Sequence, residues 1–211
     1  MNLDFENATV ELANGPGIVY ASNAIPDWSA FTGPTGNPTN SSSVGSSIIG
    51  YDTISLGGAA VFIEDSNAPS GGGPLPIQGN YSLLLQGSIP AAAGTASIAQ
   101  TGTIPLSAQS LTFWGRFAVN LQGQNLQLSF NNQALSFVSI SNVLNYAVYG
   151  VDISPFAGQT GQFLFTVPVE GYALLDNIQF SSLPIPEPVE YALAVLGVLT
   201  LGFHFRRNRS G

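Results

Sequence analysis

Short apolar runs separated by turn-forming residues are the feature that most limits what this chain can fold into. The sequence of 211 residues contains 24 Gly and 14 Pro, and Gly, Pro, Asn or Ser bound each run. No window before residue 184 combines a 3.6-residue apolar period with caps at both ends, so no helical layer is expected. The pattern predicts an all-β sandwich or barrel. The runs are Val10–Leu12, Ser47–Ile54, Ala59–Ile63, Tyr81–Gln86, Ser97–Gln100, Leu111–Val119, Leu126–Phe130, Leu135–Ile140, Tyr146–Ile153, Gln162–Val167 and Ala173–Phe180.

Two stretches have the composition of loops, Thr32–Ser47 and Asn67–Gly79, the second with a Ser-Gly-Gly-Gly-Pro core. No internal repeat indicates a solenoid or propeller. We therefore expect one β domain over residues 1–183, followed by a segment of different character over residues 184–211.

Charge is distributed unevenly along the chain. The chain contains twelve Asp and Glu residues, four Arg and no Lys, which gives a net charge of −8. Residues 1–187 contain eleven carboxylates and one cation, Arg116. Without clustered Lys and Arg the domain cannot neutralise phosphates, so no nucleic-acid partner is expected. The carboxylates offer oxygen ligands to divalent cations, or they only keep the chain soluble.

Catalytic chemistry has few residues to draw on. The chain has no Cys and one His, His204. This excludes a disulfide scaffold, a thiolate zinc site, a cysteine nucleophile and a Ser-His-Asp triad in the β domain. A glycosidase pair of carboxylates stays open, but nothing in the sequence selects one, and we do not expect an enzyme. The carboxylates available for such a pair are Glu11, Asp27, Asp52, Glu64, Asp65, Asp152 and Glu170.

The C-terminal segment has the composition of a membrane span. Val189–Phe205 is apolar except for Glu190 and His204, and seventeen helical residues reach ~25 Å, near the lower limit for a bilayer. Arg206, Arg207 and Arg209 follow it and are expected to stay at the cytoplasmic face, which places the acidic domain outside. The alternative is a buried C-terminal helix of a soluble domain.

Pro186-Glu187-Pro188, the apolar span and the terminal Arg cluster together resemble the PEP-CTERM sorting signal of Gram-negative bacteria that make exopolysaccharide. Val189 and Glu190 depart from the small residues common there. The resemblance implies an exosortase-type processing enzyme as partner, with transient residence in the inner membrane. Delivery to the cell surface or the extracellular matrix would follow.

An exported domain needs a signal peptide, yet Met1–Glu6 has neither a basic region nor an apolar one. We expect the start codon to lie further upstream, or the leader to be absent from this sequence.

Other segments resemble jelly-roll, galactose-binding-like modules: Asn2–Glu6, Leu175–Phe180, and the turn Asp152–Thr160 before a late strand. The resemblance implies that the two terminal strands pair and that a calcium ion ties them together. Glu6 and Asp176 match the carboxylate positions for that ion. The alternative is that both accept hydrogen bonds from loop amides.

The two tryptophans have different surroundings. Trp28 lies in a Pro-flanked loop beside Asp27 and is the candidate for ligand contact. Trp114 follows a strong β run and is expected in the core. Arg116, two residues later, is expected to form an ion pair.

The sequence therefore predicts a jelly-roll-type β-sandwich followed by one C-terminal transmembrane helix. The function expected is a structural or adhesive role at the cell surface, with exopolysaccharide as the expected partner there. The alternatives are a secreted carbohydrate-active enzyme, or a carbohydrate-binding module with exposed aromatic residues, carrying the same tail.

Overall fold

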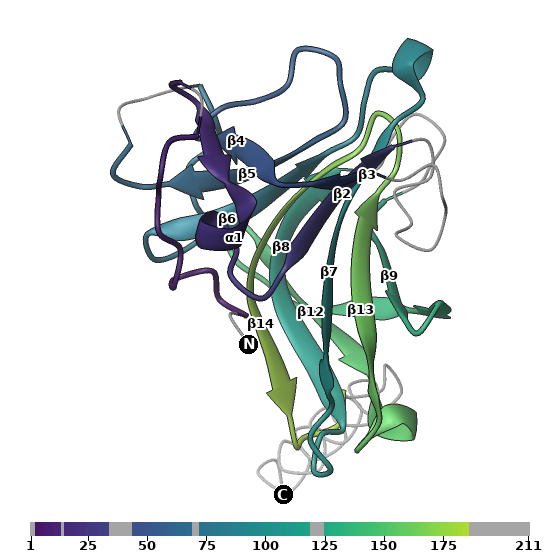
Figure 1. Ribbon diagram of the computed structural model, residues 1–211. Helices are drawn as coiled ribbons and strands as arrows, with labels where there is room; N and C mark the ends of the chain where they lie inside the picture. The colour runs from purple at the N-terminus through teal and green to yellow at the C-terminus, as the bar shows by residue number, and fades with distance from the viewer. Residues whose placement is uncertain (1–2, 14, 34–43, 69–71, 119–124, 186–211) are drawn as a thin grey trace, which may run out of the picture.

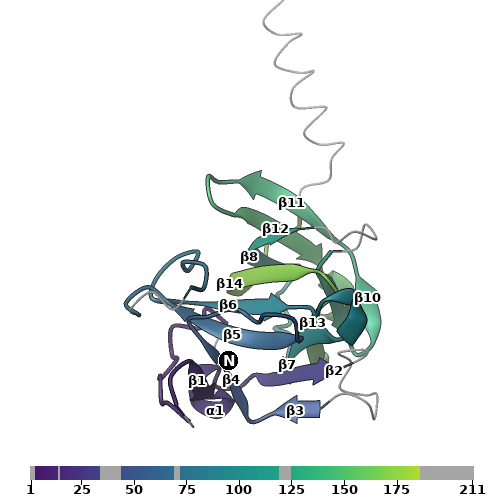
Figure 2. The same cartoon turned by 90° about the horizontal axis from the view of Figure 1, so that it is seen from above.

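Two β-sheets packed face to face form the part of the chain that the computed structural model describes, residues 3–13, 15–33, 44–68, 72–118 and 125–185 (Figures 1 and 2). The larger sheet contains, in spatial order, β1 (Ile18–Tyr20), β4 (Ile48–Tyr51), β5 (Ala60–Asp65), β6 (Tyr81–Gln86), β14 (Tyr172–Ser181), β8 (Ser110–Ala118), β12 (Ala147–Asp152) and β11 (Phe137–Asn142). The smaller sheet contains β10 (Gln133–Leu135), β9 (Gln127–Phe130), β13 (Thr160–Val167), β7 (Thr95–Thr103), β2 (Ser29–Gly33) and β3 (Val44–Ser46). Single helical turns occur at α1 (Ala21–Ala24), η1 (Pro90–Ala92) and η2 (Ser154–Phe156).

Strand alternation decides which side chains enter the core. In β8, Leu111 and Phe113 are buried, whereas Thr112 and Trp114 are half-buried, because successive side chains of a strand point to opposite faces. Phe165 of β13 meets Phe113 edge to face, with ring centroids 5.6 Å apart. The core therefore lies between the inner faces of the two sheets.

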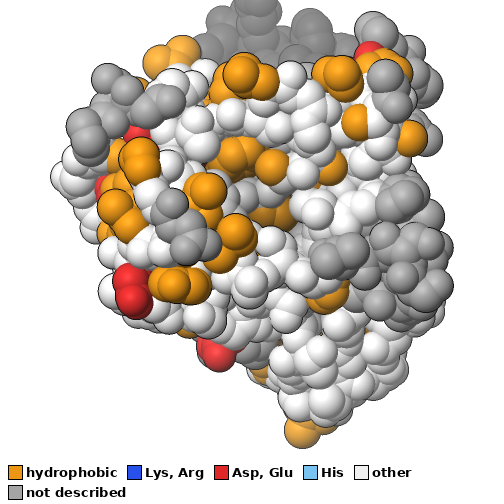
Figure 3. All heavy atoms as spheres, turned by 45° about the horizontal axis from the view of Figure 1, so that its top comes forward, with side chains coloured by type: hydrophobic (Ala, Val, Ile, Leu, Met, Phe, Trp, Pro, Cys, Tyr) orange, Lys and Arg blue, Asp and Glu red, His pale blue; other side chains and the backbone are white. Residues whose placement is uncertain are grey.

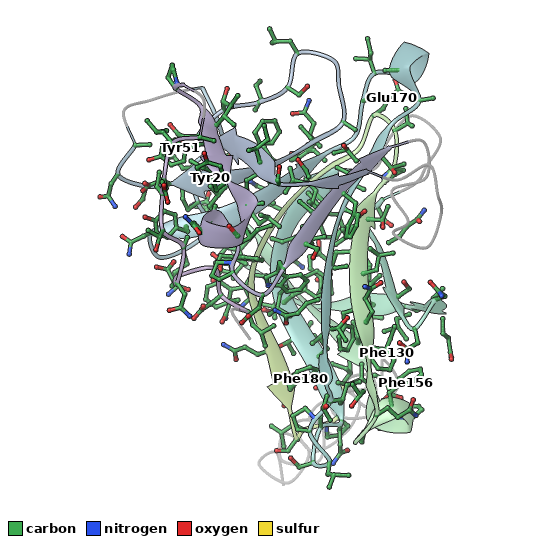
Figure 4. The ribbon with its side chains drawn as sticks, in the orientation of Figure 1. Tyr20, Tyr51, Phe130, Phe156, Glu170 and Phe180 are labelled. Atoms are coloured by element: carbon green, nitrogen blue, oxygen red, sulfur yellow. The ribbon has the colours of Figure 1, made fainter. Side chains whose placement is uncertain are left out.

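Aromatic rings also close the lower end of the core. Phe130 of β9 packs edge to face against Phe156 of η2, with centroids 5.3 Å apart (Figure 4). Phe163 of β13 lies 5.9 Å from Phe180 of β14, which joins the two sheets. Such aromatic pairs contribute about 0.5 to 1.5 kcal/mol each beyond the area they bury.

A loop, residues 72–80, crosses the outer face of the larger sheet. Phe62, Leu84 and Leu174, on the neighbouring strands β5, β6 and β14, form a second apolar cluster on this face, and Ile77 of the loop packs on it. The central strands of the larger sheet are therefore buried on both faces.

Glu64 of β5 is completely buried under this loop. Gly73 passes so close that a Cβ at its position would collide with Glu64 Oε2, so only glycine fits there. Neither carboxylate oxygen of Glu64 has a hydrogen-bond partner among the described residues. Burial, with a smaller contribution from the charge of Asp52, raises the pKa of Glu64 to about 8. The group is therefore largely protonated in the folded chain at neutral pH.

A β-bulge near the end of β14 ties the N-terminal segment to the sheet. The register between β14 and β8 shifts by one residue between Asp176 and Gln179. Asn177, inside the bulge, has a φ of 46°, which Asn tolerates better than most residues. The Ile178 side chain is buried, and its N–H donates a hydrogen bond to the Leu3 carbonyl at 2.8 Å.

The all-β sandwich expected from the sequence is confirmed, but some strand assignments are wrong. The run Val10–Leu12 makes only an isolated bridge at Leu12. Residues 3–6 form no strand, and β1 pairs with β4 instead of β14, so no terminal strand pair is seen. The sequence did not predict the short strands β1, β2, β3 and β10, and β3 lies in the stretch Thr32–Ser47 that its composition assigns to a loop.

Across the described ranges, no helix is long and apolar enough to span a membrane. The expected span, Val189–Phe205, lies outside those ranges.

The buried carboxyl group of Glu64 predicts a specific loss of stability at rising pH. The unfolded chain releases this proton near pH 4.5 and the folded chain near pH 8, so the folded state binds more protons between these values. Stability is then fully present below the lower value and falls as pH rises, by about 2 to 3 kcal/mol between pH 6 and 8. In Glu64→Gln this part of the pH dependence should disappear, which urea denaturation at a series of pH values measures. Parallel curves for parent and variant would show that Glu64 does not titrate in this range.

Candidate functional site

A cavity of about 330 Å³ opens on the outer face of the larger sheet, between loop 72–80 and the N-terminal segment. Its volume is at the lower end of the range for small-molecule sites, about 300 to 1,000 Å³. It is lined by Asp4, Glu6, Gln78, Gly79, Trp114, Asp176, Asn177 and Gln179. The fold thus brings together Glu6 and Asp176, the two carboxylates that the jelly-roll resemblance pairs across 170 residues.

Glu6 holds the end of the loop. Its Oε1 accepts hydrogen bonds from the backbone N–H groups of Asn80 at 2.9 Å and Tyr81 at 3.1 Å, and its Oε2 accepts one from Asn80 Nδ2 at 3.1 Å. Gly79 has a φ of 67°, and a Cβ at this position would collide with Glu6 Oε1. Both the left-handed backbone and the close approach require glycine here.

Asp176 holds the middle of the loop from within the sheet. Its side chain is 3% exposed. Oδ2 accepts hydrogen bonds from Ser82 Oγ at 2.8 Å and from the Gln78 N–H at 3.3 Å, and Oδ1 accepts one from the Asn177 N–H at 2.7 Å. Burial raises the pKa of Asp176 to about 6; these hydrogen bonds oppose the rise, and the charge of Glu6 adds to it.

Glu6 and Asp176, the two carboxylates expected to bind calcium, already bind groups of the protein. Both carboxylates accept hydrogen bonds from backbone N–H groups at the loop. This is the alternative role expected from the sequence. Each carboxylate oxygen accepts about two hydrogen bonds, so Glu6 Oε2 and Asp176 Oδ1 retain acceptor capacity. Calcium takes six to eight oxygens, amide oxygens among them. No group of three His, Cys, Asp or Glu residues suited to a metal occurs in the described ranges, so an ion would rely on two carboxylates plus amide and backbone oxygens.

Trp114 gives the cavity an aromatic wall. It lies on β8 directly opposite Asp176 of β14, on the outer face of the sheet. Its indole stacks on Tyr146, with ring centroids 4.9 Å apart and an interplanar angle of 24°. Leu144, in the adjacent hairpin turn, is almost fully exposed. The aromatic wall is therefore Trp114, supported by Tyr146 stacked on its indole.

The expected roles of the two tryptophans are both corrected. Trp28 is 6% exposed and packs against Phe5 and Phe165, with centroids 6.0 and 6.1 Å away. Trp28 is therefore mainly a core residue, although it also lines a surface hollow together with Tyr20 and Ser29. Trp114, expected in the core, lies on the outer face and lines the cavity.

Strand parity was the signal that could have identified Trp114. Thr112, Trp114 and Arg116 alternate with Leu111 and Phe113, and side chains two residues apart in a strand share a face. A face that carries Thr and the only Arg of the domain is the polar face. The parity of Arg116 therefore places Trp114 on the outside.

Arg116 does not form the expected ion pair with any residue in the described ranges. Its Nη2 donates a hydrogen bond to the Leu75 carbonyl oxygen at 3.2 Å instead.

The sorting motif lies outside the described residues. It comprises Pro186, Glu187, Pro188 and the basic residues Arg206, Arg207 and Arg209.

No family model matches the chain, and no curated protein matches its sequence. A Stig cyclase from Fischerella sp. TAU, solved with an indole compound, is 13% identical, with 88% of this chain and 96% of that one covered and a TM-score of 0.42. A family 11 carbohydrate-binding module from Clostridium thermocellum, solved with a mixed-linked tetrasaccharide, is 10% identical over 79% and 96%, with a TM-score of 0.36. The enzymatically active domain of a bacteriophage CBA120 tailspike is 19% identical over 81% and 21%, with a TM-score of 0.39. Scores this low assign no function to the chain.

Proposed function

We propose that this chain is an exported, jelly-roll-type β-sandwich protein that binds a carbohydrate, without cleaving it, in the cavity beside Trp114. The observation that carries the proposal is one aromatic wall in a cavity otherwise lined by acids, amides and a glycine. A sugar ring presents C–H groups on its faces and hydroxyl groups around its edge. It therefore matches an aromatic surface flanked by hydrogen-bonding groups.

The polar groups of the cavity suit hydroxyl groups. Besides Glu6 and Asp176, the lining contains the carboxylate of Asp4 and the amide side chains of Gln78, Asn177 and Gln179. Asp4 Oδ1 accepts a hydrogen bond from the Glu6 N–H at 3.3 Å. Its second carboxylate oxygen can accept one from a ligand hydroxyl group. The Gln78 amide group can both donate and accept. A ligand with several hydroxyl groups on one apolar ring satisfies this set better than an apolar ligand.

A glycosidase is the second candidate, because Asp176, with its raised pKa, and Glu6 line the same cavity. A carboxyl group with a raised pKa is the usual general acid of such enzymes. Both groups, however, are bound to loop amides, and Asp176 is almost completely buried. A general acid must reach the leaving oxygen, and this burial favours binding over catalysis.

Truncation of the aromatic wall is the direct test of carbohydrate binding. In Trp114→Ala, oligosaccharide binding measured by glycan array and calorimetry should weaken by at least tenfold, since stacking is lost while the fold is kept. The matched control is Tyr20→Ala, which removes an exposed aromatic ring of the distant β1 (Figure 4) and should leave affinity unchanged. Equal loss in both variants, or none in Trp114→Ala, would contradict the proposed site. Release of reducing sugar by the parent chain, lost in Asp176→Asn, would favour the glycosidase.

A structural calcium ion at Glu6 and Asp176 is part of the proposal. An ion would offset the repulsion between the two carboxylates, and at 100 times its dissociation constant it would stabilise the fold by about 2.7 kcal/mol. Thermal melts should then show a midpoint about 5 to 10 °C higher in calcium than in chelator. The difference should vanish in Asp176→Asn. A parent midpoint that ignores the chelator would mean that these groups serve the loop amides alone.

Localisation in this proposal depends on the C-terminal segment. The chain would enter the inner membrane through Val189–Phe205, with Arg206, Arg207 and Arg209 on the cytoplasmic side. An exosortase-type enzyme would process it near Pro186, Glu187 and Pro188, before release to the surface or to an exopolysaccharide matrix.

The acidic residue of the sorting motif gives a test with a matched control. Glu187→Ala should leave full-length protein in the inner membrane, whereas Glu190→Ala, three residues away, should be processed like the parent. Fractionation and mass spectrometry of the mature C-terminus measure both. A Glu187→Ala protein that reaches the surface with an unchanged C-terminus would show that the motif is not recognised.

A further inference from the structure

A second, larger hollow lies on the same sheet face, on the other side of loop 72–80. This cleft has a volume of about 760 Å³. Its floor is formed by neighbouring strands, with Leu84 and Gln86 of β6, Tyr172 of β14 and Arg116 of β8. Figure 3 turns this end of the molecule toward the viewer and shows hydrophobic side chains gathered on it. The apolar residues of the lining are Ile54, Pro74, Leu84, Ile89, Pro90 and Tyr172.

Two polar side chains of the cleft are already bound within the protein. Gln86 donates through Nε2 to the Ser55 carbonyl at 2.8 Å and accepts the Ser55 N–H at 3.1 Å. Ser88 Oγ accepts the Gly94 N–H at 2.6 Å and donates to the Ile89 carbonyl at 3.0 Å. These groups hold the surrounding loops and leave little polar capacity for a ligand.

Arg116 is different. A guanidinium group has five N–H donors, and the bond that Arg116 makes within the described residues uses one of them, to the Leu75 carbonyl. It is also the one cation among eleven carboxylates in residues 1–187. The single positive charge of residues 1–187 thus lies in the floor of this apolar cleft, where it is complementary to an anion.

Arg116 and Glu170, the two charged groups of the cleft, lie at different positions along β14. Arg116 pairs with Leu174 in the sheet register, two residues further along β14 than Tyr172. Glu170 lies in the turn that precedes β14, at the top of Figure 4. An anion bound at Arg116 therefore lies further along the sheet than the carboxylate of Glu170.

We infer that this cleft binds a small amphipathic carboxylate, whose anionic group pairs with Arg116 and whose apolar body lies on Pro74, Leu84 and Ile89. The net negative charge of residues 1–187 favours a small ligand with a single charge over a polyanion. An acidic polymer or an anionic membrane would bring many negative charges against eleven carboxylates, whereas a small monoanion brings one. Arginine binds a carboxylate through two parallel N–H bonds, which fixes its orientation.

The test compares 4-phenylbutyrate with 4-phenylbutyramide, which has the same apolar body without the charge. Binding to the full chain is measured by ligand-observed NMR and calorimetry. The parent should bind the acid at least tenfold more tightly than the amide. In Arg116→Gln this preference should vanish, with the melting midpoint confirming that the variant is folded, and Arg116→Lys should restore part of it.

Glu170→Gln is the matched control, since it removes a charge of opposite sign from the same cleft. It should bind the acid as tightly as the parent, or more tightly. Equal affinity of the parent for acid and amide, no binding of the acid, or a preference that persists in Arg116→Gln would each overturn the inference. None of these outcomes depends on carbohydrate binding at Trp114.

Discussion

The structure depends on covering both faces of the central strands of the larger sheet. The smaller sheet covers one face, while on the other Ile77 of loop 72–80 packs on the cluster of Phe62, Leu84 and Leu174. A loop laid on an apolar surface must find acceptors for its backbone N–H groups, since leaving them unbound costs about as much as a lost hydrogen bond. Side chains of the sheet and of the N-terminal segment supply these acceptors.

Acidic residues do most of this work, and their positions fix where hollows can form. Asp176 accepts the N–H of Gln78, and Glu6 accepts those of Asn80 and Tyr81. Loop 72–80 is thereby held across the sheet as a narrow strip, with a cavity on each side of it. The polar cavity lies on the side of Glu6 and Asp176, and the apolar cleft lies on the side of Arg116. The two proposed ligands differ because the same loop exposes different chemistry at its two edges.

The sequence predicted the fold class and the longer strands because alternation over six or more residues, bounded by turn residues, leaves few other structures. It also paired Glu6 with Asp176, but only through a resemblance, since no local pattern links residues 170 positions apart. The Trp28 prediction failed because a Pro-flanked loop beside Asp27 has the composition of a surface loop. The packing of Phe5 and Phe165 against its indole is a tertiary contact that local sequence does not reveal. Composition correctly predicted a loop over most of residues 72–80. Its path over the sheet depends on contacts with β5, β14 and residue 6, which composition does not encode.

A domain with one cation cannot neutralise all its buried acids by ion pairing, and two of these acids, Asp176 and Glu64, show the remaining solutions. Asp176 receives three hydrogen bonds, which favour its charged form and hold its pKa to about 6 against the effect of burial. Glu64 has no hydrogen bond among the described residues, and its pKa rises to about 8. Its negative charge is therefore removed by protonation, whereas that of Asp176 is stabilised by hydrogen-bond donors. In neither case does Arg116 take part, although it lies on the same sheet face. A guanidinium that is not needed to balance buried charge, in a protein so short of cations, is available to an anion from outside.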